Sequence, residues 1–340
     1  MGSNSLQRLL TDRARRAVGL LVLVLLAPSA ALRAIAQPAS TEFPPHLVTL
    51  VVPGAAAGGT DQVARIVARA LAARLGVPVV VENKAGATGM IGAEAVARAE
   101  PNGSKLLFAF TALVQAPAVF ARVPYDIEKD FVPLAQVANA PVFLGVRAES
   151  QIKSIADLIQ QGKGRERPLG YGTFGVGSSY HIYGQALARS QGLNLLHVPY
   201  KGEGLALQDL LGGVLDISFM SVGTGAPQVK AGKVRAIAMV AKSRSSLLPN
   251  VPTFAEAGVS GLDAMGWFGV LAPAATPASV TSRLATEINA VMSDKALQER
   301  LRELGFEPVS DSTPESFRAF LRAQVKLWQK LISDAGVKAE

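Results

Sequence analysis

The sequence predicts an α/β fold made of two lobes, each a mostly parallel sheet flanked by helices, with extended crossings between the lobes. Three observations predict it. Strand-like and helix-like segments alternate in two sets, long extended runs bound the second set, and each set has a glycine-rich loop behind an early strand. Strand and helix alternating at this spacing are typical of parallel sheets with right-handed crossovers.

The first 36 residues are set apart from the rest of the chain. They have a basic start, an apolar stretch from Ala17 to Leu32, and the sequence Ala34-Ile35-Ala36. This order predicts a signal peptide cleaved after Ala36, and the basic start leaves open whether export is by the Sec or the twin-arginine route. A membrane anchor would need about 20 uninterrupted apolar residues, and Pro28 interrupts this run.

Composition limits the classes of ligand and partner that the protein could bind. The formal net charge is +8, of which half lies in the leader, so the mature chain is only mildly basic, which suits a small acidic ligand. Aromatic residues make up 6% of the chain and do not interleave with Lys and Arg, which argues against nucleic acid as a partner. The chain has no Cys, which excludes disulfides, a Cys nucleophile and a lipid-modified Cys.

The first lobe is expected at 37–138 together with 260–340. Its opening strand, Leu47 to Val52, leads into the loop 54–61, and the helix that begins near Thr60 buries one face at i, i+3, i+4 spacing. The remaining early elements are predicted as strand Val79 to Glu82, helix Gly86 to Ala99 and strand Leu106 to Phe110.

The second lobe is expected at 139–259, entered through the extended run Phe131 to Val146. Its elements are predicted as strand Leu169 to Thr173, helix Ser178 to Ser190, strand Leu195 to Pro199, helix Leu205 to Leu211, strand Ile217 to Val222, a short helix to Ala231, and strand Val234 to Val240. A second extended run, Gly266 to Pro277, returns the chain to the first lobe. Helices are predicted at Pro277 to Met292, Asp294 to Leu304 and Pro314 to Ile332 to close it.

Two loops carry the candidate site. The loop GAAAGGTD at 54–61 is neither a dinucleotide fingerprint nor a P-loop, so no nucleotide cofactor is expected. Its counterpart YGTFGVGSSYH at 171–181 also follows a strand and opens a helix. Ligands of open α/β sheets bind at this edge, where helix N-termini favour anions. The predicted ligand-binding residues are Gly58, Gly59, Thr60, Asp61, Thr173, Gly175, Ser178, Ser179, His181 and Ser221.

An exported enzyme is the main alternative. A serine hydrolase would use Ser178 or Ser221 as nucleophile and His181 as base, but no G-x-S-x-G elbow is present. The sequence has only three His and no H-E-x-x-H, so no catalytic metal is expected. Glu203 is interpreted as a loop residue. Trp267 and Phe268 are interpreted as core or hinge packing residues of the return crossing, with a place in the wall of the cleft as the alternative.

Several segments together resemble the Bug family, the extracytoplasmic receptors of tripartite tricarboxylate transporters. These segments are VVPGAAAGGTDQVAR, VVVENKAGATGMIGAEAVARAEPNG, YDIEKDFVPLAQV, YGTFGVGSSYH, HVPYKGEGLALQDLLGGVLDISF, LPNVPTFAEAG and FGVLAPAATP. They occur in the family's order over essentially the whole mature chain. The resemblance implies a type II-like periplasmic binding protein that is not an enzyme and needs no cofactor.

The resemblance also implies a ligand and partners. The ligand is expected to be a di- or tricarboxylate or an aromatic acid, held by the two loops when the lobes close. The protein is expected to be a periplasmic monomer that delivers its ligand to the membrane subunits of a tripartite transporter or presents it to a sensor kinase. The run from Pro53 to Gly58 departs from the family's proline-aromatic opening, which leaves the ligand unnamed.

Overall fold

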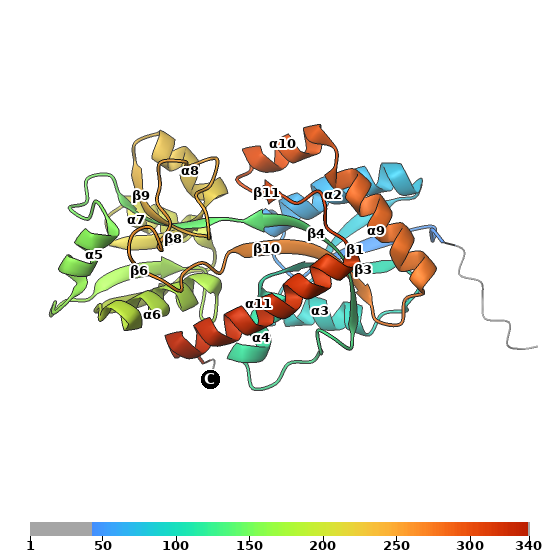
Figure 1. The fold of residues 1–340 in the computed structure, drawn as a ribbon, viewed down its shortest axis with the longest axis horizontal. Helices are drawn as coiled ribbons and strands as arrows, with labels where there is room; N and C mark the ends of the chain where they lie inside the picture. Colours follow the sequence, from blue (N-terminus) through green and yellow to red (C-terminus); the bar gives the residue numbers. More distant parts are fainter. Residues whose placement is uncertain (1–42, 339–340) are drawn as a thin grey trace, which may run out of the picture. The chain divides into compact units, whose positions relative to one another are not determined.

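The computed structural model describes residues 43–338, and the chain from Phe43 onward forms one compact unit that contains two sheets (Figure 1). The predicted signal peptide and its cleavage site lie outside the described residues. The α/β class predicted from the sequence is confirmed.

The first sheet has the strand order β11-β4-β10-β3-β1-β2. Its strands are β1 (Val48–Val52), β2 (Val79–Asn83), β3 (Lys105–Phe110), β4 (Phe131–Ala140), β10 (Gly266–Pro273) and β11 (Glu307–Pro308). The pairs β1–β2 and β1–β3 are parallel, whereas β10 is antiparallel to both β3 and β4. The sheet is therefore mixed, with its parallel part built from the early strands.

The second sheet has the order β7-β6-β8-β5-β9. Its strands are β5 (Val142–Arg147), β6 (Leu169–Thr173), β7 (Leu195–Pro199), β8 (Ile217–Ser221) and β9 (Val234–Val240). Strand β6 pairs in parallel with β7 and β8, and β5 runs antiparallel to β8 and β9. Each sheet thus combines a parallel βαβ core with antiparallel strands supplied by the extended runs.

The first extended run is divided between the two sheets. Strand β4 belongs to the first sheet and β5 to the second, and only Pro141 separates them. Proline lacks the amide hydrogen that a ladder needs, so it fits at the point where the chain leaves one sheet for the other. Strand β10, the return run, pairs along β4, so two neighbouring strands reach the junction of the sheets.

Helices cover the faces of both sheets. Their bounds are α2 (Gly59–Leu75), η1 (Ala87–Gly89), α3 (Met90–Ala97), α4 (Ala112–Val119), α5 (Ile155–Gly162), α6 (Ser179–Gln191), α7 (Glu203–Leu211), α8 (Val222–Lys230), α9 (Ala278–Met292), α10 (Lys295–Glu303) and α11 (Pro314–Ala335). Helices α4 and α5, together with β11, were not predicted from the sequence. The boundaries of the strands predicted one by one match to within a residue, but the return run forms a strand only to Pro273, four residues short of its predicted end at Pro277.

The terminal helix α11 runs alongside both sheets in Figure 1 and packs against α4 and α6, which follow strands of different sheets. Its buried face includes Phe317 and Trp328. Phe317 meets Trp267 of β10 edge to face, and Trp328 lies against Tyr183 of α6 at a centroid distance of 5.6 Å. Helix α11 therefore links the two sheets through aromatic packing.

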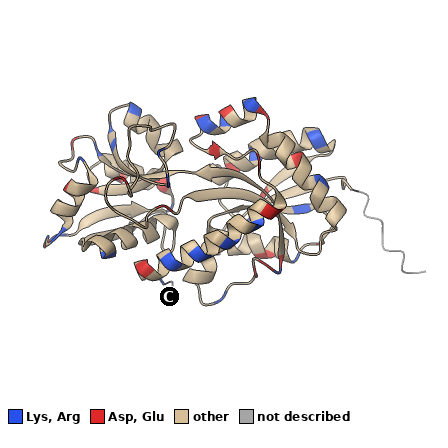
Figure 2. Ribbon diagram, viewed as in Figure 1, with Lys and Arg blue, Asp and Glu red and all other residues tan. Residues whose placement is uncertain are grey.

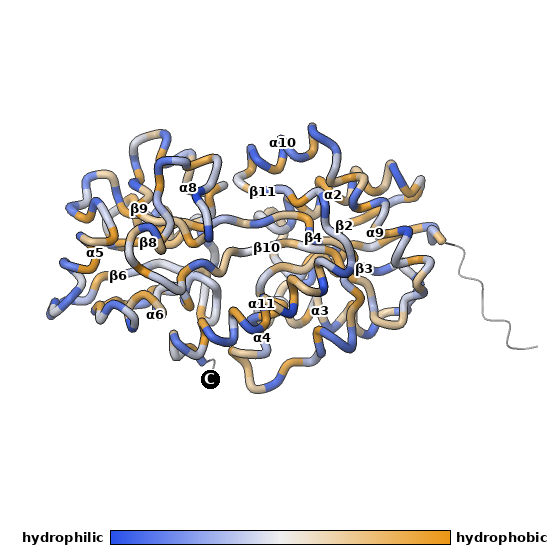
Figure 3. Tube along the Cα trace, in the orientation of Figure 1, coloured by the Kyte–Doolittle hydropathy of each residue, from blue (hydrophilic) through white to orange (hydrophobic). Residues whose placement is uncertain are grey.

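Along the helices the trace alternates between hydrophilic and hydrophobic residues, as expected for helices with one buried face (Figure 3). Charged residues lie mainly on the helices and on the loops around the sheets, with Lys and Arg repeated along α11 (Figure 2). Among residues 43–338, no helix combines the length and apolar character needed to cross a bilayer.

Candidate functional site

A cavity of about 630 Å³ lies where the two sheets meet. Ala140 of β4, Val142 of β5 and Gly266 of β10 line its base. The rest of its wall comes from both halves of the chain, namely Ala57, Gly58, Gly59, Thr60, Gln62, Thr88, Phe110, Thr111, Ala112, Gln115, Phe174, Ser178, Ser179, Tyr180, Tyr183, Gly202, Glu203, Gly204, Ser221, Gly223, Thr224, Trp267, Phe268, Glu303, Leu304 and Phe306. Its volume is in the range usual for small-molecule sites.

Five helices of the described chain begin at this cavity. The residue that caps the N-terminus of each one lines the cavity wall: Gly58 for α2, Thr111 for α4, Ser178 for α6, Gly202 for α7 and Ser221 for α8. This convergence follows from the topology, because each of these helices begins at the carboxyl end of a parallel strand, either directly or after a short loop. The positive ends of the five helix dipoles therefore surround one space.

The cavity wall carries no cationic side chain. Of the described residues that line it, none is Lys, Arg or His, and the charged ones are Glu203 and Glu303. Glu303 pairs with Arg300, 2.7 Å away, and both side chains are exposed. An anion in the cavity would thus be held by backbone amides and hydroxyls, with helix dipoles supplying the favourable potential.

Helix α2, like α4 and α7, begins without a side-chain hydrogen bond at its N-cap. Its cap, Gly58, offers no side-chain hydrogen bond, whereas Ser178 caps α6 and Ser221 caps α8 through their hydroxyl oxygens. Gly58 and Gly59 are exposed to the cavity. The first amides of α2 are therefore available to a ligand, as the bare loop before it predicts.

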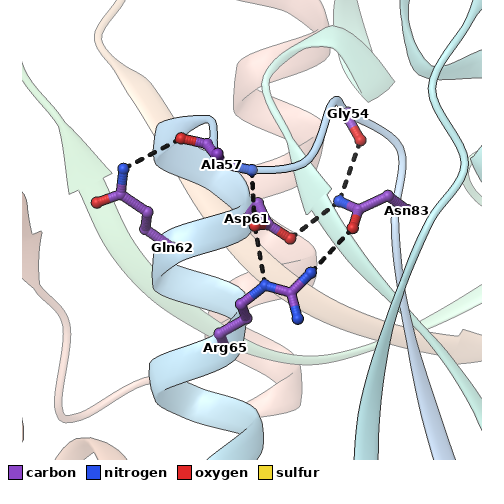
Figure 4. Close-up of polar contacts among 6 residues, drawn as sticks. All are labelled: Gly54, Ala57, Asp61, Gln62, Arg65 and Asn83. Atoms are coloured by element: carbon purple, nitrogen blue, oxygen red, sulfur yellow. Dashed lines mark hydrogen bonds and ion pairs between the residues drawn. The ribbon is translucent and has the colours of Figure 1, made fainter.

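Asp61 holds the first loop and does not line the cavity (Figure 4). Its carboxylate accepts hydrogen bonds of 2.9 Å from the Ala57 amide, from Arg65 Nε and from Asn83 Nδ2. The Asn83 amide group also donates to the Gly54 carbonyl, 3.2 Å away. Burial favours a higher pKa for Asp61, but the hydrogen bonds from Arg65, Asn83 and Ala57 outweigh burial and keep the pKa below its usual value.

The second loop divides into residues that face the cavity and residues that hold its shape. Ser178 and Ser179 line the cavity, whereas Thr173 and Gly175 do not. Thr173 is fully buried, and its hydroxyl lies 2.7 Å from Nε2 of His197 and accepts from the Gly175 amide at 3.2 Å. These contacts fix the loop so that the following helix begins with its two serines at the cavity.

His181 lies in the first turn of α6 and also faces away from the cavity lining. Its ring stacks on that of His197 at a centroid distance of 3.9 Å, and its Nδ1 accepts the Gly177 amide at 3.1 Å. Burial lowers the pKa of His181. Burial and the neighbouring His181 lower the pKa of His197 to about 4, so both rings are neutral at pH 7.

Glu203 lines the cavity, which sequence reasoning missed when it treated this residue as part of a loop. It is the first residue of α7, and its carboxylate accepts hydrogen bonds from Tyr180, Ser221 and Thr224. Burial raises its pKa, and these hydrogen bonds offset part of that rise. The acidic residue directly behind Gly202 was a usable signal, because acids favour the first turn of a helix.

Gln115 is a second residue that the sequence did not indicate. Its amide nitrogen donates to the hydroxyl of Ser179 at 2.8 Å, which joins α4 beside the first sheet to α6 beside the second. Trp267 and Phe268 also line the cavity, although both were predicted mainly as packing residues. Helix α4 was itself unpredicted, so nothing in the sequence placed Gln115 at this edge.

The structure brings six of the ten predicted residues to the cavity wall: Gly58, Gly59, Thr60, Ser178, Ser179 and Ser221. The remaining four, Asp61, Thr173, Gly175 and His181, lie behind the wall in the two loops. Within residues 43–338, no cluster of three or more His, Asp or Glu side chains has an arrangement that could hold a metal ion.

Comparison with known proteins gives one family. A family model described as "Tripartite tricarboxylate transporter family receptor" matches residues 63–337. A protein encoded in the tcbD-tcbE intergenic region of Pseudomonas sp. (strain P51) is 36% identical over 87% of this chain and 88% of its own length. Protein BugT of Bordetella pertussis is 33% identical over 89% of this chain and 94% of its own.

The similar solved structures include periplasmic binding proteins. The periplasmic binding protein BugD superposes with a TM-score of 0.78 at 35% identity, covering 88% of this chain and all of that one. An R. palustris protein solved with adipate has a TM-score of 0.79 at 31% identity, over 87% of this chain and 99% of its own. MatC from Rhodopseudomonas palustris with bound malate has a TM-score of 0.76 at 30% identity, over 85% of this chain and all of its own.

Proposed function

Because the chain belongs to the family of tripartite tricarboxylate transporter receptors, which are periplasmic solute-binding proteins, we propose that it captures a small organic carboxylate in its cavity. Capture requires no chemistry, since the relatives are binding proteins and not enzymes. The bound acid is delivered to the membrane subunits of a tripartite transporter, with a sensor kinase as the alternative recipient.

One observation carries this proposal. The N-caps of five helices line a cavity whose wall has no Lys, Arg or His among the described residues. Helix ends and backbone amides bind a carboxylate without forming a fixed ion pair, so the anion can be bound and later released. Two of the similar structures hold dicarboxylates, adipate and malate, which supports an organic acid as the ligand class.

We propose that the cavity opens and closes by a hinge between two lobes, 37–138 with 260–340 and 139–259. Within residues 43–338, the chain would pass between such lobes near the junction of β4 and β5 and again on its return into β10. Hinges of this kind need only a few residues to change their backbone angles, and Pro141 lies at one of these points. Closure would bring the amides of α2 and the serines of α6 onto the same ligand.

The hydrolase alternative lacks its required contacts. A nucleophile must share a hydrogen bond with its base, but the Ser178 hydroxyl donates to the Gly175 carbonyl at 2.7 Å. The Ser221 hydroxyl is bonded to Glu203, and Nδ1 of His181 is taken by the Gly177 amide. The two serines are helix caps in this arrangement.

A thermal-shift screen of the exported chain, residues 37–340, against carboxylic acids tests the proposal. A true ligand at a hundred times its dissociation constant should stabilise the protein by about 2.7 kcal/mol and be recovered chemically unchanged. If no organic acid raises the melting temperature, or if one is turned over and Ser178→Ala stops the turnover, the receptor function is wrong.

The variant Gly59→Val tests the role of the first loop. A side chain at Gly59 would project beside the free amides of α2, and its Cβ alone would lie 3.1 Å from the Phe306 ring. Binding of the acid found in the screen should fall at least about tenfold, because a branched side chain blocks approach to the main chain. Gly54→Ala is the control, since its added Cβ meets only Val52, 3.9 Å away, and should leave binding unchanged.

A further inference from the structure

Glu203 occupies the hydrogen-bond donors at the N-terminus of α8 with a carboxylate that belongs to the protein itself. One oxygen accepts from the Ser221 amide and, at 3.3 Å, from the Tyr180 hydroxyl. The other accepts from the Ser221 hydroxyl at 3.0 Å and from the Thr224 hydroxyl at 3.1 Å. Each carboxylate oxygen therefore has two donors, which is close to its full capacity.

These donors form the kind of group that would otherwise hold a ligand carboxylate. They combine a helix N-terminus with a backbone amide and three hydroxyls, and Ser221, Thr224 and Tyr180 all line the cavity. With Glu203 in place, the donors of this group are taken by a carboxylate of the protein itself. The opposite side still offers the uncapped N-terminus of α2.

The charges of the cavity wall also disfavour a second ligand carboxylate beside Glu203. Within the described residues, no cation lines the wall that could compensate a second negative charge placed beside Glu203. Two carboxylates close together in a partly buried site repel each other strongly. A hydroxyl or ammonium group, by contrast, adds no negative charge. It can take the place of the Ser221 hydroxyl on Glu203, because that hydroxyl can donate instead to the Thr224 hydroxyl, 3.1 Å away.

We infer that Glu203 is a specificity-determining residue, which makes this receptor select acids with a single carboxylate and a hydrogen-bond donor at the other end, and reject dicarboxylates. This inference rests on the proposed function, since it assumes that the cavity binds an organic acid. Such selectivity would distinguish this receptor from the similar proteins whose structures hold the dicarboxylates adipate and malate.

The test uses acids matched in length. Isothermal titration compares adipate with 6-hydroxyhexanoate and 6-aminohexanoate, and succinate with 4-hydroxybutanoate, on the wild-type exported chain. At least one donor-ended acid should bind about tenfold or more tightly than the diacid of its length, because like charges in contact cost several times the thermal energy. If both diacids bind as tightly as the donor-ended acids of their length, the cavity does capture acids, but Glu203 does not determine its selectivity.

The variant Glu203→Gln removes the charge and keeps the size of the side chain. It should bring the two affinities within about threefold of each other, mainly through a gain for the diacid. Glu299→Gln is the charge-matched control on α10, where Glu299 is exposed and faces Arg302, and it should leave the ratio at its wild-type value.

If Glu203 only stabilises the fold, the experiment should give a different result. Glu203→Gln would then lower the melting temperature without changing the ratio of affinities, which overturns the inference. Diacid binding by Glu203→Gln when the wild type binds none supports it. If neither protein binds any of the five acids, the selectivity inferred for Glu203 is overturned, whereas the proposed function is decided separately by the thermal-shift screen.

Discussion

At the scale of single residues, Asp61 determines the shape of the first loop. Its carboxylate is almost fully buried and accepts from Ala57, Arg65 and Asn83, so it ties the loop to α2 and to β2 (Figure 4). Ala57 needs this support, because its φ of 64° lies in the left-handed region that non-glycine residues avoid.

We expect Asp61→Ala to lower the free energy of unfolding by about 1–3 kcal/mol, the usual cost of leaving buried donors without an acceptor. Ligand binding should weaken as well, because the amides of α2 lose their fixed position. Urea unfolding followed by circular dichroism measures the first effect, and titration with the identified acid measures the second.

Gln62→Ala serves as the control for this loop. Gln62 donates to the Ala57 carbonyl at 3.2 Å, but the bond is exposed to water. Its loss should change stability by no more than about 0.5 kcal/mol. Equal effects of the two substitutions would show that the buried carboxylate is not the anchor of the loop.

The stacked histidines predict how stability depends on pH. Burial lowers the pKa of both His181 and His197, and the value for His197 is about 4. At His197 the unfolded chain takes up a proton below about pH 6.5, whereas the ring in the folded protein resists protonation until about pH 4. Stability should therefore be greatest above pH 6.5 and fall as the pH drops through this window.

For His197 alone, the free energy of unfolding should fall by about 1–2 kcal/mol between pH 7 and pH 4. This is less than the full linkage value, because the ring is only partly buried and solvent screens its charge. His197→Gln should flatten this part of the stability profile, measured by urea unfolding at a series of pH values. His46→Gln, at an exposed site before β1, should leave the profile as it is. A wild-type profile that is flat from pH 7 to pH 4 would contradict the prediction.

Residue patterns predict the backbone of this site better than its side chains. Gly58, Thr60, Ser178 and Ser221 reach the cavity because they lie where a strand gives way to a helix, and glycine and hydroxyl residues mark such junctions. Asp61 and His181 lie only one helical turn further on, yet both turn away. Their orientation depends on partners such as Asn83 and His197, which are distant in sequence.

At the scale of elements, helix α11 holds the two halves of the described chain together. Trp328 is fully buried between α11 and α6, where it contacts the ring of Tyr183, and Tyr183 itself lines the cavity. Its indole nitrogen donates to Gln324 at 3.0 Å, so both the apolar body and the polar atom are satisfied.

Trp328→Ala should lower the free energy of unfolding by about 3–5 kcal/mol, because it leaves a large void that α11 and α6 cannot both fill. Thermal or urea unfolding measures the loss. Gln329→Ala, at the neighbouring exposed position on the same helix, should stay within about 0.5 kcal/mol of the wild type. A small effect at Trp328 would mean that α11 is not a structural link between the sheets.

The elements missed from the sequence have identifiable physical causes. Helix α4 is short, almost wholly apolar and contains Pro117, and a short buried apolar run cannot be distinguished from a strand by periodicity. Helix α5 did carry a signal, since Ser154 caps it and Asp157 follows three residues later. Strand β11 has two residues and forms only by pairing with β4, so no local pattern predicts it.

At the scale of the whole described unit, the two halves touch at a point where neither can accept a side chain. Gly223, the second residue of α8, lies against the Leu304 carbonyl and Gly305 at the turn after α10. Helix α8 follows a strand of the second sheet, and this turn leads into a strand of the first. Gly223 and Leu304 both line the cavity, so the contact closes one side of it.

We expect Gly223→Ala to prevent full closure. An added Cβ would lie 2.2 Å from the Leu304 oxygen, a distance that requires the backbones to separate. If ligand binding needs the closed form, affinity for the identified acid should fall at least about tenfold, because the binding-competent state becomes rare. Small-angle scattering of the ligand-saturated protein should then give a larger radius of gyration than for the wild type.

Gly212→Ala is the matched control, because its added Cβ meets nothing closer than the Gln208 carbonyl at 3.4 Å and the residue lies at the far end of α7. Its affinity and its scattering profile should match those of the wild type. Stability of Gly223→Ala without ligand should change little, since opening relieves the clash while each half keeps its own sheet. An unchanged affinity in a protein that scatters like the closed wild type would show that the two halves need not meet at Gly223 to hold the ligand.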